Sequence, residues 1–63
     1  MFVLQATTKD IGIRYFMNCL MVTSQIECAK KYKSTQEAQN DIKSFEMLFT
    51  YETPKVEVVE LVD

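Results

Sequence analysis

Hydrophobic and polar residues follow a period of two at the start of the chain. Residues 2–8 alternate in this way and are rich in β-branched and aromatic side chains, which predicts a β-strand. The next four residues, 9–12, contain Asp10 and the only glycine, Gly12. Because Asp favours turns and Gly tolerates a positive φ, they predict a hairpin loop with Gly12 in the left-handed conformation. Residues 13–22 then predict the returning strand.

The returning strand is apolar on both faces. One face holds Ile13, Tyr15, Met17, Cys19 and Met21, and the other holds Phe16, Leu20 and Val22 with Arg14 and Asn18. An antiparallel sheet that is covered on one side shows a polar outer face. We therefore expect this strand to be covered on both sides.

Helical signals replace the alternation after residue 22. Thr23 or Ser24 can cap a short helix over 24–30. Ser34 and Glu37 then form the capping-box pattern, in which the serine side chain accepts the N–H of Glu37 and the glutamate reaches back to the cap. The main helix is therefore expected to begin at Ser34.

The main helix carries one apolar stripe, which predicts the face that it buries. The stripe consists of Ala38, Ile42, Phe45 and Phe49, with Leu48 beside it and Met47 nearly opposite. The helix should end before Pro54, and residues 55–62 predict a last strand. The alternation of that strand slips at Val58 and Val59, as a bulge or a second buried face would produce.

These elements predict an α+β fold in one domain, residues 1–63. We expect a small three-stranded antiparallel sheet made of a β-hairpin and the C-terminal strand, with a short helix and the main helix between them. The main helix packs on one face of the sheet. The first strand lies in the centre, flanked by the second strand and the last, an order that satisfies the right-handed crossover preference.

Composition indicates a folded, cytoplasmic protein without a membrane anchor. Of the 63 residues, 48% are hydrophobic and 25% charged, and no apolar run approaches the ~18 residues that a spanning helix needs. Cys19 and Cys28 lie nine positions apart without a CxxC pattern, and the chain has no histidine. We expect two reduced, partly buried thiols, although a bridge between them stays open, and neither a metal nor a cofactor.

The sequence contains few residues that could act in catalysis. General acid–base catalysis commonly uses a histidine or a carboxylate of shifted pKa in a concave pocket, and a chain of this length can scarcely wall one. Ser24 and Ser34 are explained by helix starts, and Ser44 by a helix flank. The hypothesis that follows is a protein that is not an enzyme and acts by protein contact.

Charge is distributed unevenly along the chain, whose net charge is −2. Such asymmetry can face a partner or a second copy of the chain. The charges that we assign to that role are Lys30, Lys31 and Lys33 in a basic cluster and Glu57 and Glu60 on the last strand. The alternative function is nucleic-acid binding, with Arg14, Tyr15 and Phe16 stacking on bases beside the lysine cluster.

One resemblance extends over nearly the whole chain. A hairpin is followed by Thr-x-x-Ile-x-x-Ala-x-x-Tyr over 23–32, then by Ser-Thr-x-Glu-Ala over 34–38, and then by a valine-rich strand. This order resembles short accessory proteins of bacteriophages and mobile elements. The resemblance implies a protein that binds and blocks a host macromolecule, as an anti-defence or host-takeover inhibitor does.

Self-association is the last expectation. A single main helix covers one side of a three-stranded sheet, which would leave an apolar patch on the other side. A second copy could cover that patch, which makes the chain a homodimer, unless the short helix at 24–30 covers it instead. The interface residues predicted for the patch are Phe16, Leu20, Val22, Val56, Val58 and Val59.

Overall fold

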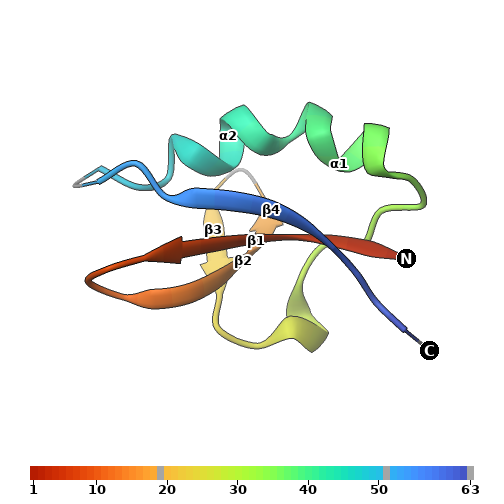
Figure 1. The fold of residues 1–63 in the computed structure, drawn as a ribbon, viewed down its shortest axis with the longest axis horizontal. Helices are drawn as coiled ribbons and strands as arrows, with labels where there is room; N and C mark the ends of the chain where they lie inside the picture. Colours follow the sequence, from red (N-terminus) through yellow and green to blue (C-terminus); the bar gives the residue numbers. More distant parts are fainter. Residues whose placement is uncertain (19, 51, 63) are drawn as a thin grey trace.

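The computed structural model describes residues 1–18, 20–50 and 52–62, and shows a curved antiparallel sheet with two short helices along one face (Figure 1). The strands are β1 (Phe2–Thr8), β2 (Gly12–Asn18), β3 (Met21–Thr23) and β4 (Lys55–Glu60). The helices are the 3-10 turn η1 (Ile26–Cys28), α1 (Thr35–Asn40) and α2 (Ile42–Glu46). This arrangement confirms the α+β class.

The sheet has four strands in the order β3-β2-β1-β4, one more than predicted. β1 is central and antiparallel to both β2 and β4, as expected. The predicted strand over 13–22 is divided into β2 and β3. The reason lies in Asn18, whose side-chain oxygen accepts the N–H of Leu20 at 2.8 Å and starts a turn. Cys19 lies outside the described residues.

The hairpin between β1 and β2 forms as the sequence predicts. Gly12 has a φ of 76°, the left-handed conformation that glycine adopts without strain. Thr8 closes the loop, because its hydroxyl accepts the N–H of Ile11 and donates to the carbonyl of Gly12. Glu52 adds a contact from a distant part of the chain, since its carboxylate accepts the N–H groups of Lys9 and Asp10.

The last strand is shorter than predicted and has no bulge. Its pairing with β1 runs without a shift from Phe2 opposite Glu60 to Thr7 opposite Lys55. Val58 points to the helices and packs against the core, whereas Val59 lies opposite Val3 on the other face of the sheet. The irregular alternation of this strand therefore reflects a second buried face and not a bulge.

The main helix is interrupted at Asp41, the residue between α1 and α2, whose side chain makes no capping hydrogen bond to α2. Asn40 and Asp41 are both poor helix formers, because their side chains compete for nearby hydrogen bonds. At the start of α1, Ser34 accepts the N–H of Glu37 as predicted, at 3.2 Å. The carboxylate of Glu37 accepts the N–H of Lys33 and not that of the cap itself.

Helix η1 is shorter than the predicted helix over 24–30 and is not capped by Thr23 or Ser24. Its first turn follows Gln25, which makes no side-chain cap, and Thr23 instead accepts the N–H of Gln25 at 3.1 Å. Cys28, expected to be partly buried, is exposed. The three-residue turn is too short to enclose the thiol.

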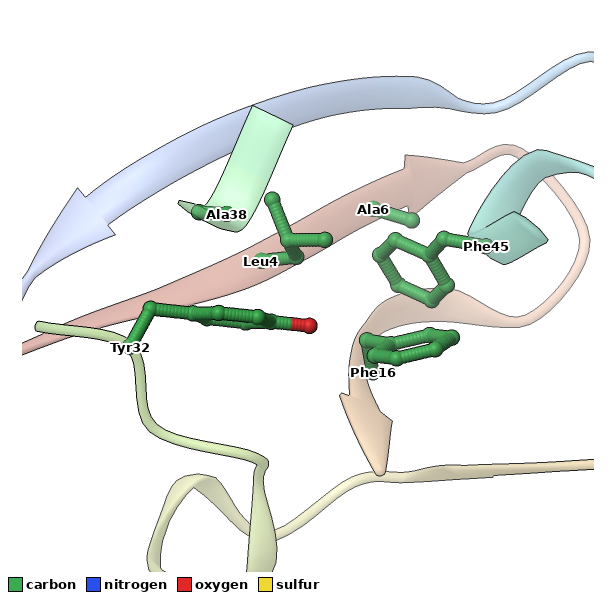
Figure 2. Close-up of a cluster of buried hydrophobic side chains, with 6 residues drawn as sticks. All are labelled: Leu4, Ala6, Phe16, Tyr32, Ala38 and Phe45. Carbon is green, nitrogen blue, oxygen red and sulfur yellow. The ribbon is translucent and has the colours of Figure 1, made fainter. Parts of the chain in front are cut away.

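The core lies between the sheet and the two α-helices (Figure 2). Phe45 is fully buried at its centre and makes edge contacts with Phe16 and Phe49, with ring centroids 5.3 and 5.5 Å away. The predicted stripe is confirmed, since Ala38 is also fully buried and its other members pack against the core. The buried residues of this core are Leu4, Ala6, Phe16, Tyr32, Ala38 and Phe45.

A first prediction tests this core. Phe45→Ala removes the central ring and should lower the free energy of unfolding by about 3–5 kcal/mol. Met47→Ala is the matched control, since Met47 is 74% exposed, and it should cost less than about 0.5 kcal/mol. Urea unfolding followed by circular dichroism measures both, and similar losses at the two positions would contradict the assignment of the buried face.

A second prediction concerns the start of α1. Ser34→Ala removes the hydroxyl that accepts the N–H of Glu37, which typically costs about 1 kcal/mol. In a domain of this size the melting temperature should fall by roughly 4–8 °C. Ser34→Asp, which keeps an acceptor at the cap, should restore most of the loss. A Ser34→Ala variant that melts like the wild type would show that the cap contributes nothing.

Candidate protein-binding surface

The face of the sheet that points away from α1 and α2 carries an exposed apolar strip. The residues that point to this side follow from the register, because Tyr15 lies opposite Thr23 and Phe16 opposite Val22. Phe16 is in the core, so its neighbours along β2 point the other way. We call the apolar members Ile13, Tyr15, Met17 and Met21 the open-face strip.

The strip is partly accessible to solvent. Ile13 is 47% exposed and Met21 is 53% exposed, whereas Tyr15 and Met17 are half-buried. Leu20, in the turn between β2 and β3, is 82% exposed and adjoins Met21 in the chain. Scattered apolar residues are normal on a surface, but a contiguous group on one sheet face is typical of a contact surface.

Part of the β1–β4 half of the same face is buried within the chain. Val3 points away from the helices and is nevertheless fully buried. Helix η1 lies on that side of the sheet, opposite α1 and α2 (Figure 1), and the adjoining Ala29 is 4% exposed. Part of the second face is therefore buried within the chain at Val3, while the strip on β2 and β3 stays accessible.

The segment after η1 enters the sheet where β1 and β2 separate. Their pairing begins at Thr8 and Gly12 and ends at Gln5 and Tyr15. Beyond this point Phe2 pairs with Tyr32 through two backbone hydrogen bonds of 2.8 Å, and the N–H of Lys30 donates to the carbonyl of Phe16. Residues 30–32 thus fill the gap between the two strands and return the chain to the helix side.

A polar cluster joins this segment to the break between the helices. The hydroxyl of Tyr32 donates to the Asp41 carboxylate at 2.6 Å, and Lys30 forms an ion pair with the same oxygen at 3.1 Å. The Lys30 ammonium also lies 5.2 Å from the centre of the Tyr32 ring. These groups hold α1 and α2 over the sheet.

The pKa values of Tyr32 and Asp41, the two acidic groups of the cluster, are both shifted away from neutral pH. Burial, and then the Asp41 hydrogen bond, raise the pKa of Tyr32 above its ordinary value of 10.0. The Tyr32 hydrogen bond, and then Lys30, hold the pKa of Asp41 below its ordinary value of 3.8 despite partial burial. The tyrosine therefore stays protonated and the carboxylate ionised at neutral pH, which suits a structural contact and not proton transfer.

The structure corrects the predicted apolar patch. Phe16 is 2% exposed and Val22, Val56 and Val58 pack against the core, so this side of the sheet lies under the helices and is not bare. Both faces of 13–22 are apolar, and alternation alone cannot say which one the helices cover. Of the predicted interface residues, Leu20 is exposed and Val59 lies partly buried beside Val3.

The predicted partner-facing charges do not form one site. Lys30 is engaged with Asp41, and Lys31 donates to the backbone carbonyls of Glu27 and Ala29. Lys33 is exposed on the link before α1. Glu57 pairs with Lys55 at 3.4 Å along β4, and Glu60 is exposed at the end of that strand.

Burial also weakens the nucleic-acid alternative. Phe16 and Tyr32 are 2% and 4% exposed, so neither ring can stack on a base. Arg14 points to the helix side and donates to the carbonyl of Ile13 at 2.8 Å. Tyr15 remains, and it belongs to the open-face strip.

A shallow hollow of about 250 Å³ lies between the β1–β2 loop and the chain after α2. No local pattern in the sequence indicates it, since the link between Glu52 and the loop spans more than forty residues. Among the described residues, no group of three His, Cys, Asp or Glu side chains could hold a metal ion. No helix in the described part of the chain is both long and apolar enough to cross a membrane.

Comparison with known proteins adds no relative to this description. The chain matches no protein-family model, no curated protein and no solved structure.

A third prediction follows from the lowered pKa of Asp41. A carboxyl whose pKa is lowered by folding stabilises the fold above its unfolded pKa, and this contribution is lost as the pH falls through the folded value. The wild type should therefore melt higher than Asp41→Asn at about pH 6, and the difference should shrink below about pH 4.

Thermal unfolding between about pH 2 and 7 measures this difference, with the exposed Asp10→Asn as control. The control should melt like the wild type over the whole range. A difference between wild type and Asp41→Asn that is independent of pH would show that the ionised form of Asp41 is not what stabilises the fold.

Proposed function

We propose that this protein is a non-catalytic protein-binding module, and that the open-face strip is where it contacts its partner. The observation that carries the proposal is the exposure of Ile13 and Met21 on one sheet face. Leaving these side chains in water costs free energy that a complementary apolar surface would recover.

The surroundings of the strip support a protein partner. Its centre holds Tyr15, an aromatic residue of the kind that often dominates the binding energy of interfaces. Across the sheet the same face becomes polar, through residues such as Gln5 and Glu57 that lie opposite each other on β1 and β4. An apolar centre beside a polar margin is the usual composition of a protein contact surface.

The biological role is proposed from the resemblance to phage-type accessory proteins. Such a protein acts in the host cytoplasm, where it occupies a surface of a host macromolecule and blocks it. This role requires no catalytic group and no cofactor, and it needs one stable surface of the kind that the strip provides.

A fourth prediction tests the strip directly. The double variant Ile13→Lys/Met21→Lys places two charges on the strip and should abolish capture of a specific protein from a bacterial lysate. The matched control is Met47→Lys/Val62→Lys, which adds the same charge at positions that are 74% and 93% exposed elsewhere on the molecule. Circular dichroism checks that both variants are folded.

The result expected is one captured protein that survives nuclease treatment and is retained by wild type and control but lost by the strip variant. Capture by the strip variant at the wild-type level would place the contact elsewhere. Recovery of nucleic acid alone, lost after nuclease, would overturn the protein-binding proposal in favour of the alternative function.

A further inference from the structure

In the described part of the chain, the outer edge of β4 is the longest unpaired strand edge of the sheet. β4 pairs with β1 on one side, over the six residues Lys55–Glu60, and it is the last strand in the sheet order. The opposite edge is β3, which has three residues. A free strand edge exposes a row of backbone N–H and C=O groups that another strand can pair with.

The outward backbone groups of β4 can be identified from the pairing. In an antiparallel pair, alternate residues direct both their N–H and C=O to the same neighbour. The N–H of Leu61 donates to the carbonyl of Met1 at 2.7 Å, which places Leu61, Val59 and Glu57 on the side of β1. The backbone N–H and C=O groups of the alternate residues therefore point outward, namely those of Val56, Val58 and Glu60. These groups form no hydrogen bond with another described residue.

Of the features that commonly prevent strands from pairing, this edge has charged side chains but neither a bulge nor a proline within the strand. Its register with β1 is continuous, so no bulge turns it away, and Pro54 precedes the strand and does not interrupt it. Two of its charged side chains, Lys55 and Glu57, neutralise each other in an ion pair of 3.4 Å. The three valines of the strand, Val56, Val58 and Val59, have high strand propensity.

We propose that the β4 edge pairs with the β4 edge of a second copy, antiparallel, with Val58 opposite Val58. A two-fold axis at this position places Val56 of each copy opposite Glu60 of the other. All the outward backbone groups of Val56, Val58 and Glu60 then find partners, because the outward residues of one copy meet the outward residues of the other.

The register with Val58 at the axis is favoured over the two neighbouring registers, because of charge and of the backbone groups that each register pairs. With Val58 at the axis, Glu57 lies opposite Val59 and no carboxylate faces another directly. Moving the axis to Glu57 places two carboxylates directly opposite each other and pairs Glu60 with Pro54, which has no N–H to donate. Moving it to Val59 pairs Val56 with Val62, beyond the end of the strand.

The dimer does not depend on the open-face strip. A two-fold axis perpendicular to the sheet joins the two sheets edge to edge and keeps both helix layers on the same side. The strip lies on β2 and β3, at the other edge of each sheet, and stays accessible. Failure of the partner-binding proposal and failure of the dimer proposal are thus separate outcomes.

A fifth prediction tests the paired edge with Glu60→Pro and its control Glu60→Gln. Both substitutions remove the charge of an exposed side chain. Only proline also removes the outward N–H of residue 60, which does not bond to β1. Sedimentation at micromolar concentration should give a species of twice 7.3 kDa for the wild type and for Glu60→Gln. Because each dimer loses two hydrogen bonds, Glu60→Pro should dimerise at least ~10-fold more weakly.

Hydrogen exchange of the wild type locates the interface without any variant. The amides of Val56, Val58 and Glu60 should be protected in the dimer and exchange rapidly on dilution to monomer, whereas those of Glu57 and Val59 should be protected in both. A monomer at every concentration would overturn the proposal. So would a dimer in which the outward amides exchange freely, or one that Glu60→Pro leaves unchanged.

Discussion

The architecture depends on how the gap between β1 and β2 is filled. These strands pair from the hairpin loop only as far as Gln5 and Tyr15, and then separate. Tyr32 occupies the gap, where its backbone bonds to Phe2 and its side chain joins the core. Without it the N–H and C=O of Phe2 would lose both of their 2.8 Å hydrogen bonds to Tyr32.

The same residue determines where the helices lie. The Tyr32 hydroxyl holds Asp41 at the break between α1 and α2, and the Tyr32 ring lies beside Leu4 and Ala38 in the core (Figure 2). The chain must cross from one side of the sheet to the other to make these contacts, and η1 is the part of that path that lies on the second face. On that face Val3 is fully buried, whereas Ile13 and Met21 on the β2–β3 half are exposed.

Local patterns predicted the parts of this fold that depend on local interactions. The left-handed glycine at 12, the cap at Ser34 and the stripe through Phe45 each rest on residues within a few positions of one another, and the structure confirms them. The central position of β1 also followed, since few strand orders satisfy the crossover preference.

The errors arose partly at local interruptions and partly where contacts between distant residues decide the outcome. Asn18 and Asp41 interrupt a strand and a helix whose apolar pattern continues past them, and Asp41 does so in contact with Tyr32, which lies before the helix. The candidate surface was assigned to the wrong side of β2 for a similar reason. A strand with two apolar faces carries no local signal for which face the helices cover, and only the packing of Phe16 on Phe45 decides it.

The two proposed surfaces also have a joint consequence. In the dimer, both open-face strips would lie on the same side of a continuous sheet, at its two ends, since the two-fold axis is perpendicular to that sheet. Each strip alone is small, and small interfaces bind weakly. A partner that offers two copies of its own site would be held at both strips, and the second contact would form at a high effective concentration. A weak surface on a chain of this size would then support stable binding to a symmetric or repetitive target.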